Sequence, residues 1–200
     1  MLTILSIAVL ILSVIVHEVS HGYMADRLGD PTARLQGRLT LNPIRHIDPI
    51  GSVIVPLITS LAGFTFGWAK PVPYNPYNLK NRRSGELLIA LAGPVSNLAL
   101  ALIFGLIIRY VQNGVMTPFI QIASYIVLIN IVLAVFNLIP IPPLDGSKVL
   151  FSLLPQQYGH TRMLMERYSQ IFIVIVVIFV WQFISPIIWP IFRAFTGIDF

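Results

Sequence analysis

The feature of this sequence that most constrains its fold is a set of long stretches with almost no charge. Residues 1–16 contain no charged side chain. A helix needs about 20 mostly apolar residues to cross the hydrocarbon core of a bilayer, so we expect the first stretch to continue to about Ala25. Further apolar stretches follow. The sequence therefore predicts an all-α polytopic membrane protein with about four full transmembrane helices, over residues 2–25, 86–110, 117–138 and 169–192.

Composition agrees with a membrane protein and narrows its chemistry. Charged residues make up 10% of the chain, against about a quarter in soluble domains. The chain has no cysteine, which excludes disulfide scaffolds, thiolate zinc sites and cysteine nucleophiles. The net charge of +5 follows from the positive-inside rule. We expect no nucleic-acid partner, because the chain has no basic helix or aromatic RNA-binding motif.

Residues 47–66 are apolar but are interrupted by Gly51, Pro56 and Gly63. The loops on both sides are basic, and a full crossing would place one of them outside, against the positive-inside rule. A re-entrant or half-buried segment keeps both loops on the same side. We therefore expect re-entry, a chain that begins outside the cell, and one membrane domain over residues 1–200.

The pattern His17-Glu-Val-Ser-His21 lies inside the first predicted span. Histidines four apart on a helix share a face and are able to bind one zinc ion, and the glutamate beside the first histidine reaches the water that attacks the substrate. Chance predicts roughly 0.001 such patterns in a chain of this composition. The alternative is a pair of structural histidines bonded to carbonyls, with Glu18 neutral. A functional site is favoured because clustered ionisable groups in an apolar helix are costly.

A catalytic zinc site needs a third protein ligand and keeps one open position. Asp145 is the candidate that follows a long apolar helix, within a run of prolines. A third span that starts outside delivers Asp145 to the level of His17 and His21. The alternative for Asp145 is an ordinary cap or turn carboxylate. The other candidates that we considered are His46, Asp48, Glu86, His160 and Glu166.

Three motifs together closely resemble the site-2 protease family of intramembrane zinc metalloproteases. They are His17-Glu-Val-Ser-His21, Ala92-Gly-Pro-Val-Ser-Asn97 and Asn137-Leu-Ile-Pro-Ile-Pro-Pro-Leu-Asp-Gly146, and Gly67-Trp-Ala-Lys-Pro-Val-Pro73 is also typical of short members. The resemblance implies that His17, His21 and Asp145 bind one zinc per chain and that Glu18 is the general base.

Asn97 and Asn137 match positions that the family keeps near its active site. The resemblance implies that Asn137 helps to hold the substrate backbone. Hydrogen bonding between helices explains Asn97 equally well and is the better explanation for Asn130.

Residues 35–41 alternate between two sets of side chains, which predicts a short strand. Leu35, Gly37, Leu39 and Leu41 lie on one side, and Gln36, Arg38 and Thr40 lie on the other. One hypothesis is that the open edge of this strand pairs with an unwound substrate. The alternative is a strand that only closes a local hairpin.

We expect the protein to hydrolyse peptide bonds within or near transmembrane segments of membrane proteins. The predicted partners are a transmembrane protein or peptide substrate and the lipid bilayer, and the sequence leaves the oligomeric state open. We expect a multi-pass protein of a prokaryotic cell (plasma) membrane, with its active site nearer the cytoplasmic side and with substrate selection by the membrane part or a partner. Two alternatives are a catalytically inactive relative that binds membrane segments and an ion-coupled transporter.

Overall fold

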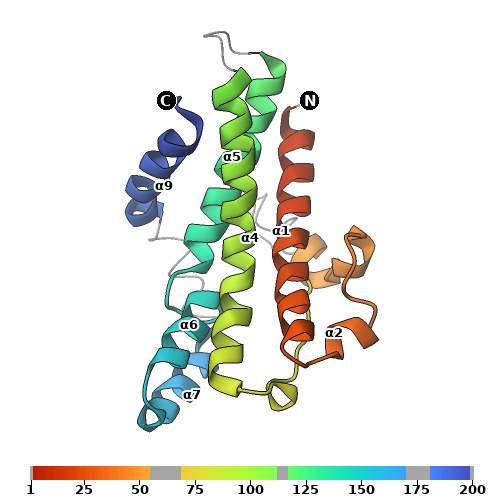
Figure 1. Cartoon of the computed structure of the whole chain (residues 1–200), viewed down its shortest axis with the longest axis vertical. Coiled ribbons are helices and arrows are strands. Elements are labelled where there is room, and N and C mark those ends of the chain that lie inside the picture. The colour runs from red at the N-terminus through yellow and green to blue at the C-terminus, as the bar shows by residue number, and fades with distance from the viewer. Residues whose placement is uncertain (1, 55–68, 112–116, 170–180, 199–200) are drawn as a thin grey trace.

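Three long helices form the centre of the structure. The computed structural model describes residues 2–54, 69–111, 117–169 and 181–198. The three helices are α1 (Leu2–Arg27), α4 (Arg82–Val111) and α5 (Pro118–Asn137), and α4 runs antiparallel to both α1 and α5 (Figure 1). Each contains a stretch long and apolar enough to cross a bilayer. These helices match three of the four predicted spans to within a few residues.

The fourth predicted span and the re-entrant segment lie partly outside the described residues. Of the span over 169–192, the described part falls mainly in α9 (Trp181–Thr196). These 16 residues span about 24 Å, less than the hydrocarbon core of about 30 Å. A fourth full span is therefore not confirmed. Of the segment 47–66, the described part is mainly the π-helical turn η2 (Pro49–Ile54), and its re-entry stays a prediction.

The predicted strand over 35–41 is wrong, because the described part of the chain contains no strand. Residue 35 instead ends the short helix α2 (Thr32–Leu35). The amide of Gly37 donates to Arg34 O at 3.0 Å and that of Arg38 to Ala33 O at 2.9 Å. Gly37 has φ +63°, so these bonds close the helix in the way that a glycine in the left-handed region allows.

The two alternating sets of side chains also do not divide into a buried side and an exposed side. Leu35 and Leu41 are exposed, whereas Arg38 is buried. The alternation is therefore accidental, because a helix ends within the segment. A glycine is typical of such a helix end. The 3-10 turns η1 (Pro43–His46) and η3 (Pro76–Asn78) belong to the same connection between α1 and α4.

A turn rich in proline joins α5 to the helix α6 (Asp145–Leu153). The turn η4 (Gln156–Tyr158) and the helix α7 (Gly159–Arg167) follow. Arg83 at the start of α4 donates to the carbonyl of Ser152 at 2.5 Å and to that of Leu153 at 2.7 Å. A Cβ atom on Gly146 would lie 2.2 Å from Leu138 O, so only glycine lets α6 begin this close to the end of α5.

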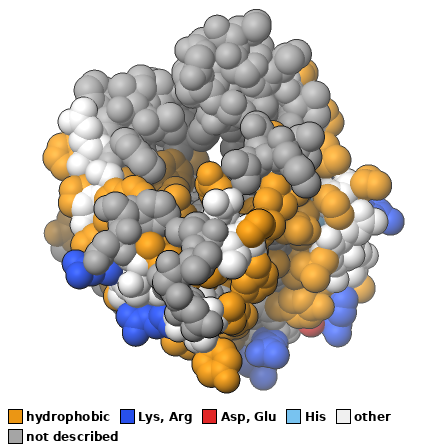
Figure 2. All heavy atoms as spheres, turned by 90° about the horizontal axis from the view of Figure 1, so that it is seen from above, with side chains coloured by type: hydrophobic (Ala, Val, Ile, Leu, Met, Phe, Trp, Pro, Cys, Tyr) orange, Lys and Arg blue, Asp and Glu red, His pale blue; other side chains and the backbone are white. Residues whose placement is uncertain are grey.

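Helix α9 packs against α4 and α5 around a shared apolar core. The fully buried members of this core include Ile108 of α4, Ile131 of α5 and Phe192 of α9. Many large apolar side chains also face outward, among them Leu12 of α1 and Leu106 of α4. Figure 2, which looks along the bundle from above, shows hydrophobic side chains over much of the described part that is visible from this end, with Lys and Arg near the rim. Such a surface suits a lipid environment.

Candidate metal centre

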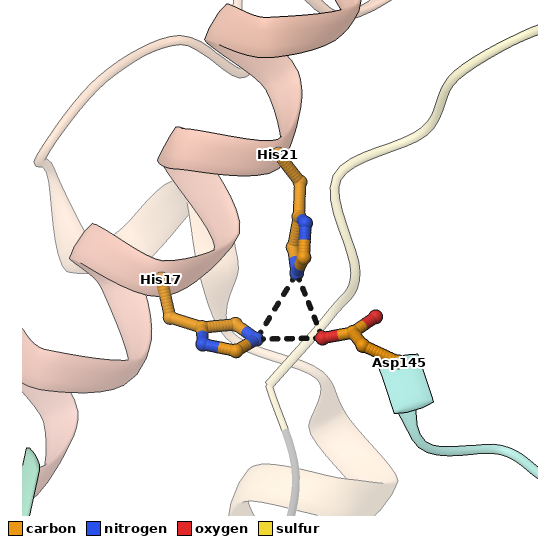
Figure 3. Close-up of side chains that lie close together, drawn as sticks. All are labelled: His17, His21 and Asp145. Atoms are coloured by element: carbon orange, nitrogen blue, oxygen red, sulfur yellow. Dashed lines mark hydrogen bonds and ion pairs between the residues drawn. The ribbon is translucent and has the colours of Figure 1, made fainter. Parts of the chain in front are cut away.

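Three buried side chains from two distant parts of the chain converge on one point. His17 and His21 lie on α1, and Asp145 is the first residue of α6. Figure 3 shows their ligand atoms as a triangle. His17 Nε2 and His21 Nε2 each lie 3.0 Å from Asp145 Oδ2, and the two Nε2 atoms lie 3.0 Å apart. The structure thus brings together the three predicted metal ligands.

Local structure explains why these side chains meet. Residues four apart on α1 lie on the same face, and the imidazole rings of His17 and His21 meet edge to face with their centroids 4.6 Å apart. A glycine of the neighbouring helix α4 allows the close approach. A Cβ atom on Gly93 of α4 would lie 2.5 Å from His21 Nε2 and 2.6 Å from His17 Nε2. Helix α4 therefore forms the back wall of the site with its bare backbone.

Hydrogen bonds to the far side of each ring determine its tautomer. His17 Nδ1 lies 2.6 Å from Asn97 Oδ1, and His21 Nδ1 lies 2.6 Å from the carbonyl of Ile89. Both partners accept hydrogen bonds, so each Nδ1 carries the proton. A neutral ring then presents the lone pair of Nε2 to the centre of the triangle.

The triangle fits a zinc ion in both its chemistry and its spacing. Two imidazole nitrogens and one carboxylate oxygen are a common ligand set for catalytic zinc. Tetrahedral bonds of about 2.0–2.1 Å separate their donor atoms by about 3.3 Å, close to the 3.0 Å of the triangle. Three lone pairs this close repel one another unless a cation shares them. Within the described residues no other group of histidines and acids has this arrangement.

A chain of buried polar side chains supports His17 from behind. Asn97 Nδ2 donates to Asn130 Oδ1 at 2.7 Å, and Asn130 Nδ2 donates to Ser13 Oγ at 2.9 Å. These residues come from α4, α5 and α1, and all are buried. Asn97 therefore both joins the helices and orients a candidate ligand. The sequence left open a position near the active site and hydrogen bonding between helices, and one network includes both.

Glu18 lies beside the triangle without joining it. Its Oε2 accepts a hydrogen bond from the backbone N–H of Val72 at 2.9 Å. Asp145 Oδ1 accepts one from Lys148 Nζ at 3.2 Å, which leaves Oδ2 for the histidines. The sequence analysis did not assign a role at the site to four residues that lie there: Lys148, Ser13, Gly93 and Val72. The motifs around positions 72 and 93 were the only signals that pointed to any of them.

Other sequence candidates have different surroundings. Asn137 Nδ2 donates to Leu133 O on its own helix at 2.9 Å. Glu86 is buried and pairs with Arg82 at 2.9 Å and with Arg162 at 3.2 Å. His46 Nε2 lies 2.8 Å from Thr40 O. None of these three belongs to the group that the candidate metal ligands form.

Comparisons with known proteins agree with this geometry. Residues 109–183 match the model of peptidase family M50. YwhC of Bacillus subtilis, a candidate zinc metalloprotease, is 41% identical over 192 residues, which cover 92% of this chain and 84% of YwhC. Rip2 of Mycolicibacterium smegmatis, also a candidate zinc metalloprotease, is 32% identical over 148 residues, which cover 74% of this chain and 56% of Rip2.

The archaeal zinc metalloprotease MJ0392 of Methanocaldococcus jannaschii is 27% identical over 156 residues, 76% of this chain and 35% of that protein. No solved structure gives a significant match. The resemblance to YwhC over most of both chains, together with the matching family model, shows that this chain belongs to peptidase family M50, the site-2 protease family.

Proposed function

We propose that this protein is an intramembrane zinc metalloendopeptidase that hydrolyses peptide bonds within or near the transmembrane segments of other membrane proteins. The observation that carries the proposal is the buried triangle of His17, His21 and Asp145 next to Glu18, on a helix able to cross a bilayer. Membership of a peptidase family supports the same reaction.

In this proposal His17, His21 and Asp145 hold the zinc ion. When bound, zinc supplies Lewis acidity, which polarises the scissile carbonyl and acidifies water. Glu18 accepts a proton from the attacking water and delivers a proton to the leaving amine. Asn97 keeps the proton of His17 on Nδ1, so that Nε2 stays a ligand. Asn137, at the end of α5, contacts the substrate backbone.

The depth of the site sets two requirements for the reaction. Glu18 lies nine residues before Arg27 at the end of α1, or about 14 Å along the helix. Water must reach this depth. A helical substrate hides its carbonyls in its own hydrogen bonds, so it must be unwound locally before cleavage.

The charge distribution supports a cytoplasmic position of the site. All Lys and Arg residues except Arg109 and Arg193 lie in the segments 27–83 and 148–167. The described parts of these segments lie in the half of the bundle where α1 ends and α4 begins (Figure 1). By the positive-inside rule this end faces the cytoplasm. Asp145 follows α5 on the same side, so the active site lies in the cytoplasmic half of the protein.

The test compares three proteins purified in detergent: wild type, Glu18→Gln and Glu166→Gln. Glu166 is an exposed acid on α7 that pairs with Arg162, and it serves as the matched control. Bound zinc and cleavage of a synthetic transmembrane peptide are measured for each. We expect zinc in all three and cleavage by wild type and Glu166→Gln alone.

Cleavage that persists in Glu18→Gln would refute the assigned mechanism. Zinc binding without cleavage by the wild type would favour a relative that only binds membrane segments. The absence of both zinc and cleavage would favour the transporter, in which the buried acids and histidines belong to an ion pathway.

A further inference from the structure

The extended segment 69–73 crosses α1 next to Glu18 and touches it through one backbone group. Val72 N–H donates to Glu18 Oε2 at 2.9 Å. Proline has no N–H, so Val72 carries the only backbone donor of Pro71-Val72-Pro73. The residue before a proline is restricted to extended conformations. The direction of this N–H is therefore preset by its two neighbours.

The fit between this segment and α1 depends on Gly22, which lies one helical turn after Glu18. A Cβ atom on Gly22 would lie 2.7 Å from Val72 Cγ1 and 2.6 Å from Leu39 Cδ2. Glycine thus allows the segment to approach the helix backbone on the face that carries Glu18. The side chain of Val72 is buried in this contact.

The opposite side of the segment is bound by Arg38. Arg38 Nη2 donates to Lys70 O at 2.8 Å and to Pro71 O at 3.2 Å, and Nη1 donates to the carbonyl of Arg45. The amide of Lys70 also donates to His46 O at 2.9 Å. Arg38 is buried, and a planar guanidinium holds several carbonyls in a fixed geometry. Consecutive peptide groups of the segment are thus bound on one side by Arg38 and on the other by Glu18.

We propose that Val72 and Arg38 are positioning residues for catalysis. Val72 N–H holds one oxygen of the Glu18 carboxylate, which directs the other oxygen to proton transfer, and Arg38 keeps the segment in place. A charge-assisted bond from a rigid backbone donor orients a carboxylate without ordering a further side chain. The inference rests on the proposed function, because it takes Glu18 as the general base.

The test removes the Val72 donor without removing its bulk. Val72→Pro eliminates the N–H and keeps a side chain of similar size, whereas Val72→Ala keeps the N–H and loses more packing. Cleavage of a synthetic transmembrane peptide and bound zinc are measured in detergent. We expect Val72→Pro to lower kcat by about 10–100-fold, with KM and zinc content within about twofold of wild type. Val72→Ala, which keeps the N–H, should lower kcat less than Val72→Pro does.

A second pair of variants tests the same inference through Arg38. Arg38→Met removes every donor to the segment, and Arg38→Lys keeps a cation able to donate to carbonyls. Arg34→Met is the matched control, since the Arg34 side chain is 65% exposed and pairs with Asp26. We expect kcat to fall in Arg38→Met, to be partly restored in Arg38→Lys, and to be unchanged in Arg34→Met. If Val72→Pro does not fold or does not bind zinc, the comparison of Arg38→Met with Arg34→Met tests the positioning role by itself.

Equal kcat values for Val72→Pro and Val72→Ala, or for Arg38→Met and Arg34→Met, would overturn the inference. Such a result beside an inactive Glu18→Gln leaves the proposed function intact. Cleavage by Glu18→Gln overturns both.

Discussion

Replacing Gly93 by alanine tests whether α4 forms the back wall of a metal site. The added Cβ would lie 2.5 Å from His21 Nε2 and 2.6 Å from His17 Nε2, whereas ordinary contact begins at 3.4 Å. Helix and rings must therefore move apart by about 0.9 Å. Metal sites tolerate about 0.2 Å in ligand distances, so at least one histidine loses its place.

We expect Gly93→Ala to lower zinc affinity by about 10–100-fold and cleavage by about 100-fold. Zinc affinity is measured by competition with a chromophoric chelator, and cleavage with a synthetic transmembrane peptide. Without a clash, alanine would stabilise a helix by about 1 kcal/mol relative to glycine. A loss of zinc affinity and cleavage would therefore come from steric displacement of the ligands, because helix propensity alone predicts a more stable protein.

Two other glycines provide controls for this substitution. A Cβ on Gly105 of α4 would lie 2.8 Å from Phe195 Cβ, and one on Gly159 would meet nothing within 4 Å. Gly105→Ala should lower the thermal unfolding midpoint and leave zinc affinity unchanged. Gly159→Ala should also leave zinc affinity unchanged, and it should not lower the unfolding midpoint. A Gly93→Ala protein with the zinc affinity of wild type would refute this account of the site.

Three further predictions concern the surroundings of the site. Asn97→Ala removes the acceptor of His17 Nδ1 and should weaken zinc binding by about 10–100-fold; unchanged affinity in a chelator competition would restrict Asn97 to helix packing. Removing zinc with a chelator should abolish cleavage and lower the thermal unfolding midpoint, because a ligand of the folded state stabilises it; zinc should restore both, and cleavage in excess chelator would contradict the metal mechanism. Burial alone would raise the pKa of Asp30, but hydrogen bonds from Thr32, Asn78 and the amide of Asn75 outweigh it and lower this pKa. The stability that Asp30 contributes is therefore present above its unfolded pKa of about 3.9 and is lost as the pH falls below it. The difference in unfolding midpoint between wild type and Asp30→Asn, both free of metal, should shrink between pH 6 and pH 3.5, and a constant difference would contradict the shift.

The helical core and the cluster of candidate metal ligands were predictable because they depend on local patterns. Hydropathy alone located α1, α4 and α5, since a bilayer imposes a length on any helix that crosses it. The spacing of His17 and His21 places both on one face of α1. Asp145 was found because prolines end α5 just before it, and few other acids follow an apolar helix.

The error over residues 35–41 shows where a local pattern fails. Apolar residues at alternate positions indicate a strand only if the chain stays extended. Asp30, Pro31 and Thr32 instead begin a helix, and Gly37 ends it. These residues were visible in the sequence and were stronger evidence than the alternation, because the Asp30 carboxylate accepts from the Thr32 N–H and Gly37 adopts the left-handed conformation after the helix.

The sequence by itself determined the membrane class, three candidate spans and the candidate metal ligands, because hydropathy and helical spacing act within one helix. The tertiary structure alone decided which tautomer His17 adopts, which glycine faces the imidazoles and which backbone group binds Glu18. Those features depend on contacts between residues far apart in the chain, such as the 80 positions between His17 and Asn97. No local pattern records such a contact, because it exists only after the helices have packed.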